Sequence, residues 1–216
     1  METSVDTVNS GVLQGRGSEN VPAGVRLFVG SGLDASTFTG DITNERPGVI
    51  ASEQDAGILI EDNITFNGQI VNRGTIQSGN GLAIDASGAF GEIDVFNDRR
   101  GILEGDVVLG EGNDTLLNEN SDGLNITGGG GNDLITGGSG DNIYSFDLGS
   151  GQDTITDFQN DRDVLDLGSY FGGNVSEALS ATSQTGNDAF IDLGDNNSIT
   201  LTNVDASNLT AENFTV

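Results

Sequence analysis

Glycine and aspartate recur at a fixed spacing in the second half of this chain, which has 216 residues. Residues 128–136 read GGGGNDLIT and fit the nine-residue pattern G-G-x-G-x-D-x-U-x, in which U is a large apolar residue. Residues 137–145 fit it too, except that Asn142 stands at the aspartate position. Less regular copies occupy 109–117, 118–127 and 148–156, the middle one having ten residues.

Each copy divides into a six-residue loop and a three-residue strand. Glycines let the loop bend sharply and aim several carbonyls into one hollow, and the aspartate adds a carboxylate. Calcium takes about six to eight such oxygen ligands, whereas magnesium demands a stricter octahedron and keeps its waters. The apolar position recurs in every copy, which favours packed strands over a flexible Gly/Asp linker. The pattern therefore predicts bound Ca²⁺.

Successive nine-residue turns should lie on opposite sides of a flattened spiral, so that each turn stacks on the one two turns away. One side then holds Asp114, Asp133 and Asp153, and a calcium ion between stacked loops gives two good sites there. The other side holds the 118–127 stretch with Asp122, then Asn142, then the 161–163 region. We expect this second side to bind calcium less well, because Asn142 offers only a neutral oxygen.

The predicted metal ligands within the repeats are thus loop glycines, one serine, one asparagine and three aspartates. They are Gly110, Gly112, Asp114, Gly128, Gly130, Asp133, Gly137, Ser139, Asn142, Gly149, Gly151 and Asp153.

These repeats resemble the RTX family (hemolysin-type calcium-binding repeats), whose nonapeptides form a parallel β-roll. The segments DTITDF (153–158) and DRDVLDL (161–167) are similar to the closing segment of that family. The resemblance implies that Asp157 and Asp163 complete the last calcium sites. Residues 186–216 are similar to the C-terminal cap of type I secreted proteins, and their last five residues fit the style of an uncleaved export signal. The resemblance covers about 105–216 and implies export by type I secretion machinery to an extracellular or bacterial cell-surface location.

The first half carries a different repeat. Residues 5–13, VDTVNSGVL, and 68–76, GQIVNRGTI, share an apolar residue, an Asn, a Gly and a second apolar residue, and looser copies lie at 42–50 and 95–103. Short apolar stretches follow at 23–28, 56–60 and 80–84. This spacing predicts a parallel β-solenoid, in which one coil buries its apolar side only against the next. The repeated Asn is expected to form a side-chain ladder, and a β-sandwich with similar turns is the alternative.

Composition limits the partners. The formal charge is −27, and the 7 basic residues are all Arg. Residues 101–216 hold 20 acidic residues and one Arg, whereas 1–100 hold 14 and six. Such a chain attracts cations and repels nucleic acid, although acidity for solubility alone is the simpler explanation. No run of 18 apolar residues occurs, so no membrane insertion is expected.

Catalysis is not expected. The chain has no His and no Cys, which excludes triads that need them and zinc sites built from them. The carboxylate pairs Glu61–Asp62 and Glu92–Asp94 fit exposed corners better than a glycosidase site. Arg99 and Arg100 form an adjacent basic pair that we expect to be solvated.

Together these patterns predict an all-β chain with three segments. Residues 1–104 form a β-helix-like solenoid, 105–167 a calcium-binding β-roll, and 168–216 a cap with a secretion signal. The expected function is a secreted structural or adhesive protein of a surface layer, biofilm matrix or self-assembling fibre, with calcium and a polysaccharide as partners. The alternative is the non-catalytic C-terminal module of a larger secreted enzyme, polysaccharide-active or proteolytic.

Overall fold

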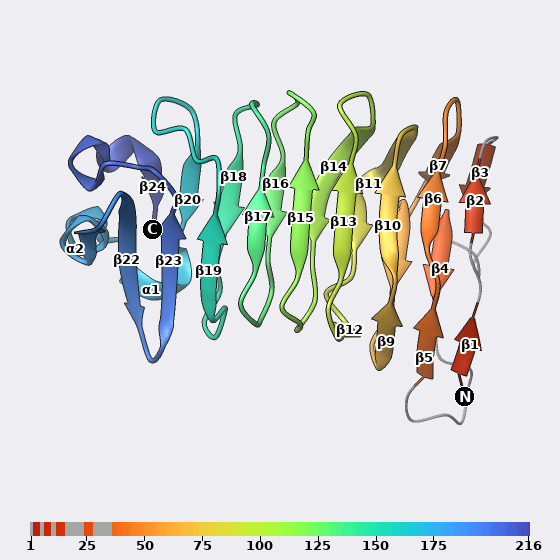
Figure 1. The fold of residues 1–216 in the computed structure, drawn as a ribbon, viewed down its shortest axis with the longest axis horizontal. Coiled ribbons are helices and arrows are strands. Elements are labelled where there is room, and N and C mark those ends of the chain that lie inside the picture. The colour runs from red at the N-terminus through yellow and green to blue at the C-terminus, as the bar shows by residue number, and fades with distance from the viewer. Residues whose placement is uncertain (1, 5–6, 10–11, 16–23, 28–35) are drawn as a thin grey trace.

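The chain forms an elongated parallel β-solenoid, seen in the computed structural model (Figure 1). The structure describes residues 2–4, 7–9, 12–15, 24–27 and 36–216. Strands stack coil upon coil in three sheets, and nearly all pairings along the solenoid are parallel. The predicted fold class is therefore confirmed, and a β-sandwich is excluded for the described residues. Parts of the predicted repeat copies at 5–13 and 23–28 lie outside these residues.

The first coils have three faces. The shortest sheet contains β1 (Glu2–Ser4), β5 (Ser36–Thr39), β9 (Ile64–Asn67) and β12 (Ala89–Phe90). The second sheet begins with β2 (Thr7–Asn9), β6 (Ile42–Asn44), β10 (Gln69–Asn72) and β13 (Asp94–Asn97). The third begins with β3 (Val12–Gly15), β7 (Val49–Ser52), β11 (Thr75–Asp85) and β14 (Ile102–Val108), and β4 (Val25–Leu27) and β8 (Ile58–Ile60) join it beside β11.

The repeat region has two faces. Its strands alternate between the second sheet, with β15 (Thr115–Asn118), β17 (Leu134–Thr136) and β19 (Gln152–Ile155), and the third, with β16 (Asn125–Thr127), β18 (Ile143–Ser145) and β20 (Val164–Asp166). Each strand pairs with the one two turns away, so the predicted stacking of alternate nonapeptides is confirmed.

A small cap covers the C-terminal end. It begins with two short helices, α1 (Gly168–Phe171) and α2 (Val175–Ser180). The antiparallel strands β21 (Thr182–Thr185), β22 (Asp188–Gly194) and β23 (Asn197–Leu201) follow, then the 3-10 turns η1 (Ala206–Asn208) and η2 (Ala211–Asn213) and β24 (Phe214–Thr215). Strands β23 and β24 extend the two long sheets. No helix among the described residues is both long and apolar enough to cross a membrane.

The core contains two long apolar ladders, one from each long sheet. The apolar position of every nonapeptide points inward and packs on its equivalents above and below. One ladder comprises Ile42, Ile70, Val95, Leu116, Ile135, Ile155 and Leu201. The other comprises Ile58, Ile84, Val107, Ile126, Tyr144, Leu165 and Phe214. These shared ladders rigidly position the loops at both corners.

A buried asparagine ladder runs along the first coils. The Asn44 Nδ2 donates to Asn72 Oδ1 at 2.8 Å, and Asn72 Nδ2 to Asn97 Oδ1 at 2.7 Å. Asn97 continues the ladder to Asn118, again at 2.8 Å, and Asn118 donates to the Gly137 carbonyl. The expected ladder is confirmed from Asn44 onward, and it reaches one residue further than the sequence repeat indicated.

Candidate metal centre

Three glycine-rich loops stack at one corner of the repeat region. The loops 109–114, 128–133 and 148–153 lead into β15, β17 and β19. The glycines at the fourth position of the pattern, Gly112, Gly131 and Gly151, lie directly on one another. Gly131 has φ of 113°, and a Cβ there would overlap the Gly112 carbonyl. Only glycine allows both this backbone and this stacking distance.

The predicted aspartates form a ladder at the same corner, which we call the first corner. The backbone N–H of Asp114 donates to Asp133 Oδ1 at 2.8 Å, and that of Asp133 to Asp153 Oδ1 at 3.0 Å. Asp114 in turn accepts from the N–H groups of Ile93 and Gly110, at 2.7 and 3.0 Å. The predicted stacking of these three aspartates is therefore confirmed.

Burial makes these carboxylates costly to ionise. Asp133 is 3% exposed, and Asp114 and Asp153 are each 1% exposed. Burial raises the pKa of Asp133 to about 8, against a hydrogen bond that lowers it and with the charges of Asp153 and Asp114 raising it further. Burial also raises the pKa of Asp153 to about 7 and that of Asp114 to about 6. A positive charge at this corner would reverse these shifts.

The second carboxylate oxygens are the groups at the first corner that a cation could bind. The Oδ2 atoms of Asp133 and Asp153 are buried and have no hydrogen-bond partner among the described residues. The Asp133 Oδ2 lies against Gly128, whose lack of a side chain leaves room for it. A buried, unpaired carboxylate oxygen is a costly feature that a bound cation would satisfy.

Backbone carbonyls must supply the rest of any coordination shell. Within the described ranges, no group of three or more acidic, His or Cys side chains lies close enough to hold a metal. A hollow of about 250 Å³ lies against these loops, lined among others by Gly110, Glu111, Gly130 and Gly149. Carboxylate plus carbonyl oxygen is a hard-oxygen donor set, so the residues present fit calcium.

The opposite corner, which we call the second corner, is built differently. Asp163 Oδ1 accepts from the N–H of Asn142 at 2.9 Å, and Asn142 Oδ1 accepts from the N–H of Leu124 at 3.0 Å. The Asp157 carboxylate accepts from the N–H groups of Gly137 and Gly138, at 2.9 and 2.8 Å. Burial raises the pKa of both Asp157 and Asp163. Asp122 does not join them: it is exposed, and the extra residue in 118–127 places Leu124 opposite Asn142.

Side-chain donors reach the loop carbonyls at the second corner. Asn142 Nδ2 lies 3.2 Å from the Gly140 carbonyl and 3.4 Å from that of Gly138. Gln159 Nε2 reaches the Gly138 carbonyl at 3.3 Å, and Arg162 Nη1 reaches that of Ser139, also at 3.3 Å. Sequence analysis did not single out Gln159 or Arg162, because their positions follow from the irregular turn at 159–163.

Tyr144 fills the apolar position of its repeat and is fully buried. Its hydroxyl has no hydrogen-bond partner among the described residues by distance and angle, and it lies against Gly137. Burial first, and then the charges of Asp163 and Asp157, raise its pKa well above the usual range. The hydroxyl therefore stays neutral beside the second corner.

The structure places the remaining predicted ligands in two groups. Gly110, Gly112, Gly128, Gly130, Gly149 and Gly151 surround the first corner, and Gly137 and Ser139 lie in the loop of the second. Whether each of these residues contacts a metal stays a prediction.

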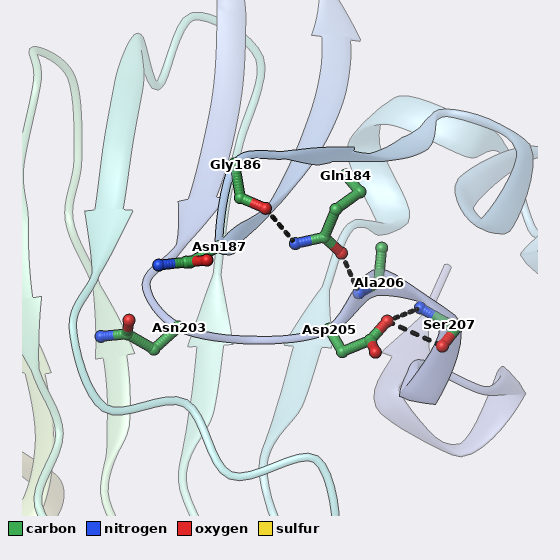
Figure 2. A pocket seen from close by; sticks show the side chains of 7 residues that line it. All are labelled: Gln184, Gly186, Asn187, Asn203, Asp205, Ala206 and Ser207. Carbon is green, nitrogen blue, oxygen red and sulfur yellow. Dashed lines mark hydrogen bonds between the residues drawn. The ribbon is translucent and has the colours of Figure 1, made fainter.

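A separate open hollow lies in the cap (Figure 2). It measures about 600 Å³ and is lined by polar side chains. Most of these are engaged in holding the cap together: the Gln184 amide contacts the carbonyl of Gly186 and the N–H of Ala206, and Asp205 accepts from Ser207. The hollow is therefore a structural feature of the cap.

Comparison with known proteins carries no argument about function. No protein-family model matches the chain, and no curated protein matches it. Among solved structures, the chain is similar to the extracellular lipase LipA from Serratia marcescens, with a TM-score of 0.46 and 16% sequence identity. All of this chain is covered, and it spans 38% of the length of that lipase. The resemblance to RTX repeats therefore rests on the motifs and on the geometry of the two corners.

Proposed function

We propose that this chain is a non-catalytic, calcium-binding module of the RTX type within a secreted protein, and that it becomes fully ordered when calcium binds. The observation that carries the proposal is the first corner, where two stacked aspartates, Asp133 and Asp153, each keep a buried carboxylate oxygen that has no hydrogen-bond partner among the described residues. Calcium would supply the positive charge that these oxygens and the surrounding acidic residues lack.

The chain's own residues prepare the site. The apolar ladders fix the spacing of the loops, the backbone N–H groups orient one oxygen of each aspartate, and the glycines allow the loops to stack. The second half, with 20 acidic residues and a single Arg, repels itself until cations neutralise it. Because the unfolded chain offers no preformed site, binding free energy becomes folding free energy.

The two corners are proposed to differ. At the first corner the Oδ2 atoms of Asp133 and Asp153 have no hydrogen-bond partner among the described residues, so they are available to a cation. At the second corner the side chains of Asn142, Gln159 and Arg162 already donate to loop carbonyls. We therefore propose that the first corner carries the calcium dependence of folding and that the second binds calcium more weakly.

Of the two settings expected from the sequence, we propose the module of a larger secreted protein over an adhesive or matrix-forming one. This choice rests on the first corner and the C-terminal cap, and we propose that both serve folding. Export through type I machinery fits this setting, since the chain would order itself where calcium is abundant. Self-association into fibres or a surface layer remains open to a direct test by light scattering.

The test is a calcium titration of the metal-depleted protein, followed by far-UV circular dichroism and by calorimetry. The proposal expects the β signal to rise with calcium, to fall back with EGTA and not to be restored by magnesium. Circular dichroism that is unchanged by chelation would overturn the calcium-folding proposal. Scattering that grows with calcium would move the choice of setting toward a matrix-forming protein.

A further inference from the structure

Four of the chain's 7 arginines lie in neighbouring turns of the first coils. These are Arg46, Arg73, Arg99 and Arg100. They lie in the turns that join β6 to β7, β10 to β11 and β13 to β14, directly after the asparagine ladder. These turns stack on one another because their flanking strands are paired in register.

Three of these arginines line a single cavity of about 240 Å³, which we call the arginine corner. Its lining, among the described residues, contains no acidic side chain and consists of Arg46, Pro47, Gly48, Arg73, Gly74, Thr75, Arg100 and Ile102. Arginines that share a cavity repel one another, so this arrangement is not explained by solubility in a chain of net charge −27.

The guanidinium groups are engaged to different degrees. Arg46 spans the stacked turns, because its Nε donates to the Arg73 carbonyl at 3.0 Å and its Nη2 to the Arg100 carbonyl at 3.1 Å. Arg73 pairs with Glu45 at 2.7 Å. The Arg100 guanidinium makes no hydrogen bond or ion pair with any described residue, so its charge is free for a ligand.

The shape and chemistry of the arginine corner select the kind of ligand. Guanidinium groups bind carboxylates through paired, planar hydrogen bonds. Pro47 and Ile102 add apolar surface, and Thr75 adds a hydroxyl. The volume lies below the range of about 300–1,000 Å³ for typical small-molecule clefts, which suits one ring with one charged group.

We propose that the arginine corner binds the carboxylate of an acidic sugar, a uronate residue of an oligosaccharide. Arg100 would hold the carboxylate, Arg46 would add positive charge, and the sugar ring would lie against Pro47 and Ile102. The proposal is independent of the proposed calcium site at the first corner, which lies in later coils of the solenoid.

The experiment is a calorimetric titration of the folded protein with digalacturonate, with the same free calcium in both solutions. Arg100→Ala is expected to weaken binding about tenfold or more, because it removes a charged hydrogen-bond donor. Arg99→Ala is the matched control: its side chain is 81% exposed, faces Glu119 at 3.6 Å and does not line the cavity. It should change the affinity by less than about twofold.

Three further measurements keep the proposal falsifiable. Arg100→Lys keeps the charge but loses the paired geometry, so intermediate binding is expected. The methyl ester of digalacturonate keeps the rings and loses the charge, and should not bind. No binding of digalacturonate by the native chain, equal loss in Arg99→Ala, or equally tight binding of inorganic phosphate would each overturn the assignment. Calcium-dependent circular dichroism of each variant reports separately on folding, so failure here leaves the proposed function untouched.

Discussion

At the scale of the residue, Asp133 is central to the first corner because it lies between Asp114 and Asp153 in the ladder. Asp133→Asn keeps an oxygen that can accept the Asp114 N–H but removes the charge. We expect calcium affinity to fall about tenfold or more, while the calcium-free protein becomes no less stable, since a buried carboxylate with a raised pKa is gone. Calorimetry and urea unfolding with and without calcium measure the two effects.

Asp122→Asn is the matched control, because Asp122 lies in the same repeat region but is exposed. It should leave calcium affinity nearly unchanged. A purely structural role for Asp133 predicts the opposite pattern, in which Asp133→Asn destabilises the protein equally with and without calcium.

Asn142 tests the difference between the two corners. Asn142→Asp restores the aspartate of the repeat and removes the amide that donates to the Gly138 and Gly140 carbonyls. We expect about one additional calcium ion per chain and a less stable calcium-free protein, because the new carboxylate would lie close to Asp163. Native mass spectrometry counts the ions. An unchanged calcium count would show that the second corner cannot be converted by one residue.

At the scale of the element, the loops depend on glycines that do two different things. Gly131 and Gly149 both have positive φ, 113° and 89°, but only Gly131 lies against another carbonyl. Gly149→Ala should cost about 1–3 kcal/mol through backbone strain alone. Gly131→Ala should cost about 1–3 kcal/mol more, because the added methyl group overlaps the Gly112 carbonyl.

Urea unfolding in saturating calcium compares these two variants. If they were equally destabilised, the close stacking of the loops would contribute nothing beyond the backbone conformation, and the description of the first corner would need revision.

At the scale of the whole molecule, acidity couples folding to pH as well as to calcium. The folded, calcium-free protein holds protons on Asp114, Asp133 and Asp153, whose pKa values are about 6, 8 and 7, whereas the unfolded chain releases them near pH 4. The unfolded state thus binds fewer protons between those limits, so the free energy of unfolding falls as the pH rises from about 4 to 8.

We therefore expect calcium-depleted protein to unfold at a higher temperature at about pH 5 than at about pH 8. Thermal unfolding of dialysed protein checks this, with calcium-saturated protein at neutral pH as the reference. Greater stability of the calcium-free protein at the higher pH would mean that these carboxyls are not buried in that state.

The sequence by itself determined the parallel solenoid, the alternation of the repeats between two sheets and the stacking of Asp114, Asp133 and Asp153. These follow from local spacing, since a nine-residue period fixes which residue faces inward and which turn lies above which. Asn118 and Asp122 show where spacing fails. Asn118 joins the asparagine ladder without the signature of the first-half repeat. Asp122 lies two residues before Leu124, which stands opposite Asn142.

Only the tertiary structure decided which polar atoms are satisfied. It left the Oδ2 atoms of Asp133 and Asp153 without a hydrogen-bond partner among the described residues. It brought the side chains of Gln159 and Arg162 to carbonyls of another coil. It also brought arginines from three coils to one cavity: Arg46, Arg73 and Arg100. Whether a buried oxygen has a partner, or a guanidinium is free, depends on side-chain directions after the coils have stacked. Because the coil length varies along the chain, no fixed sequence period predicts these contacts between coils.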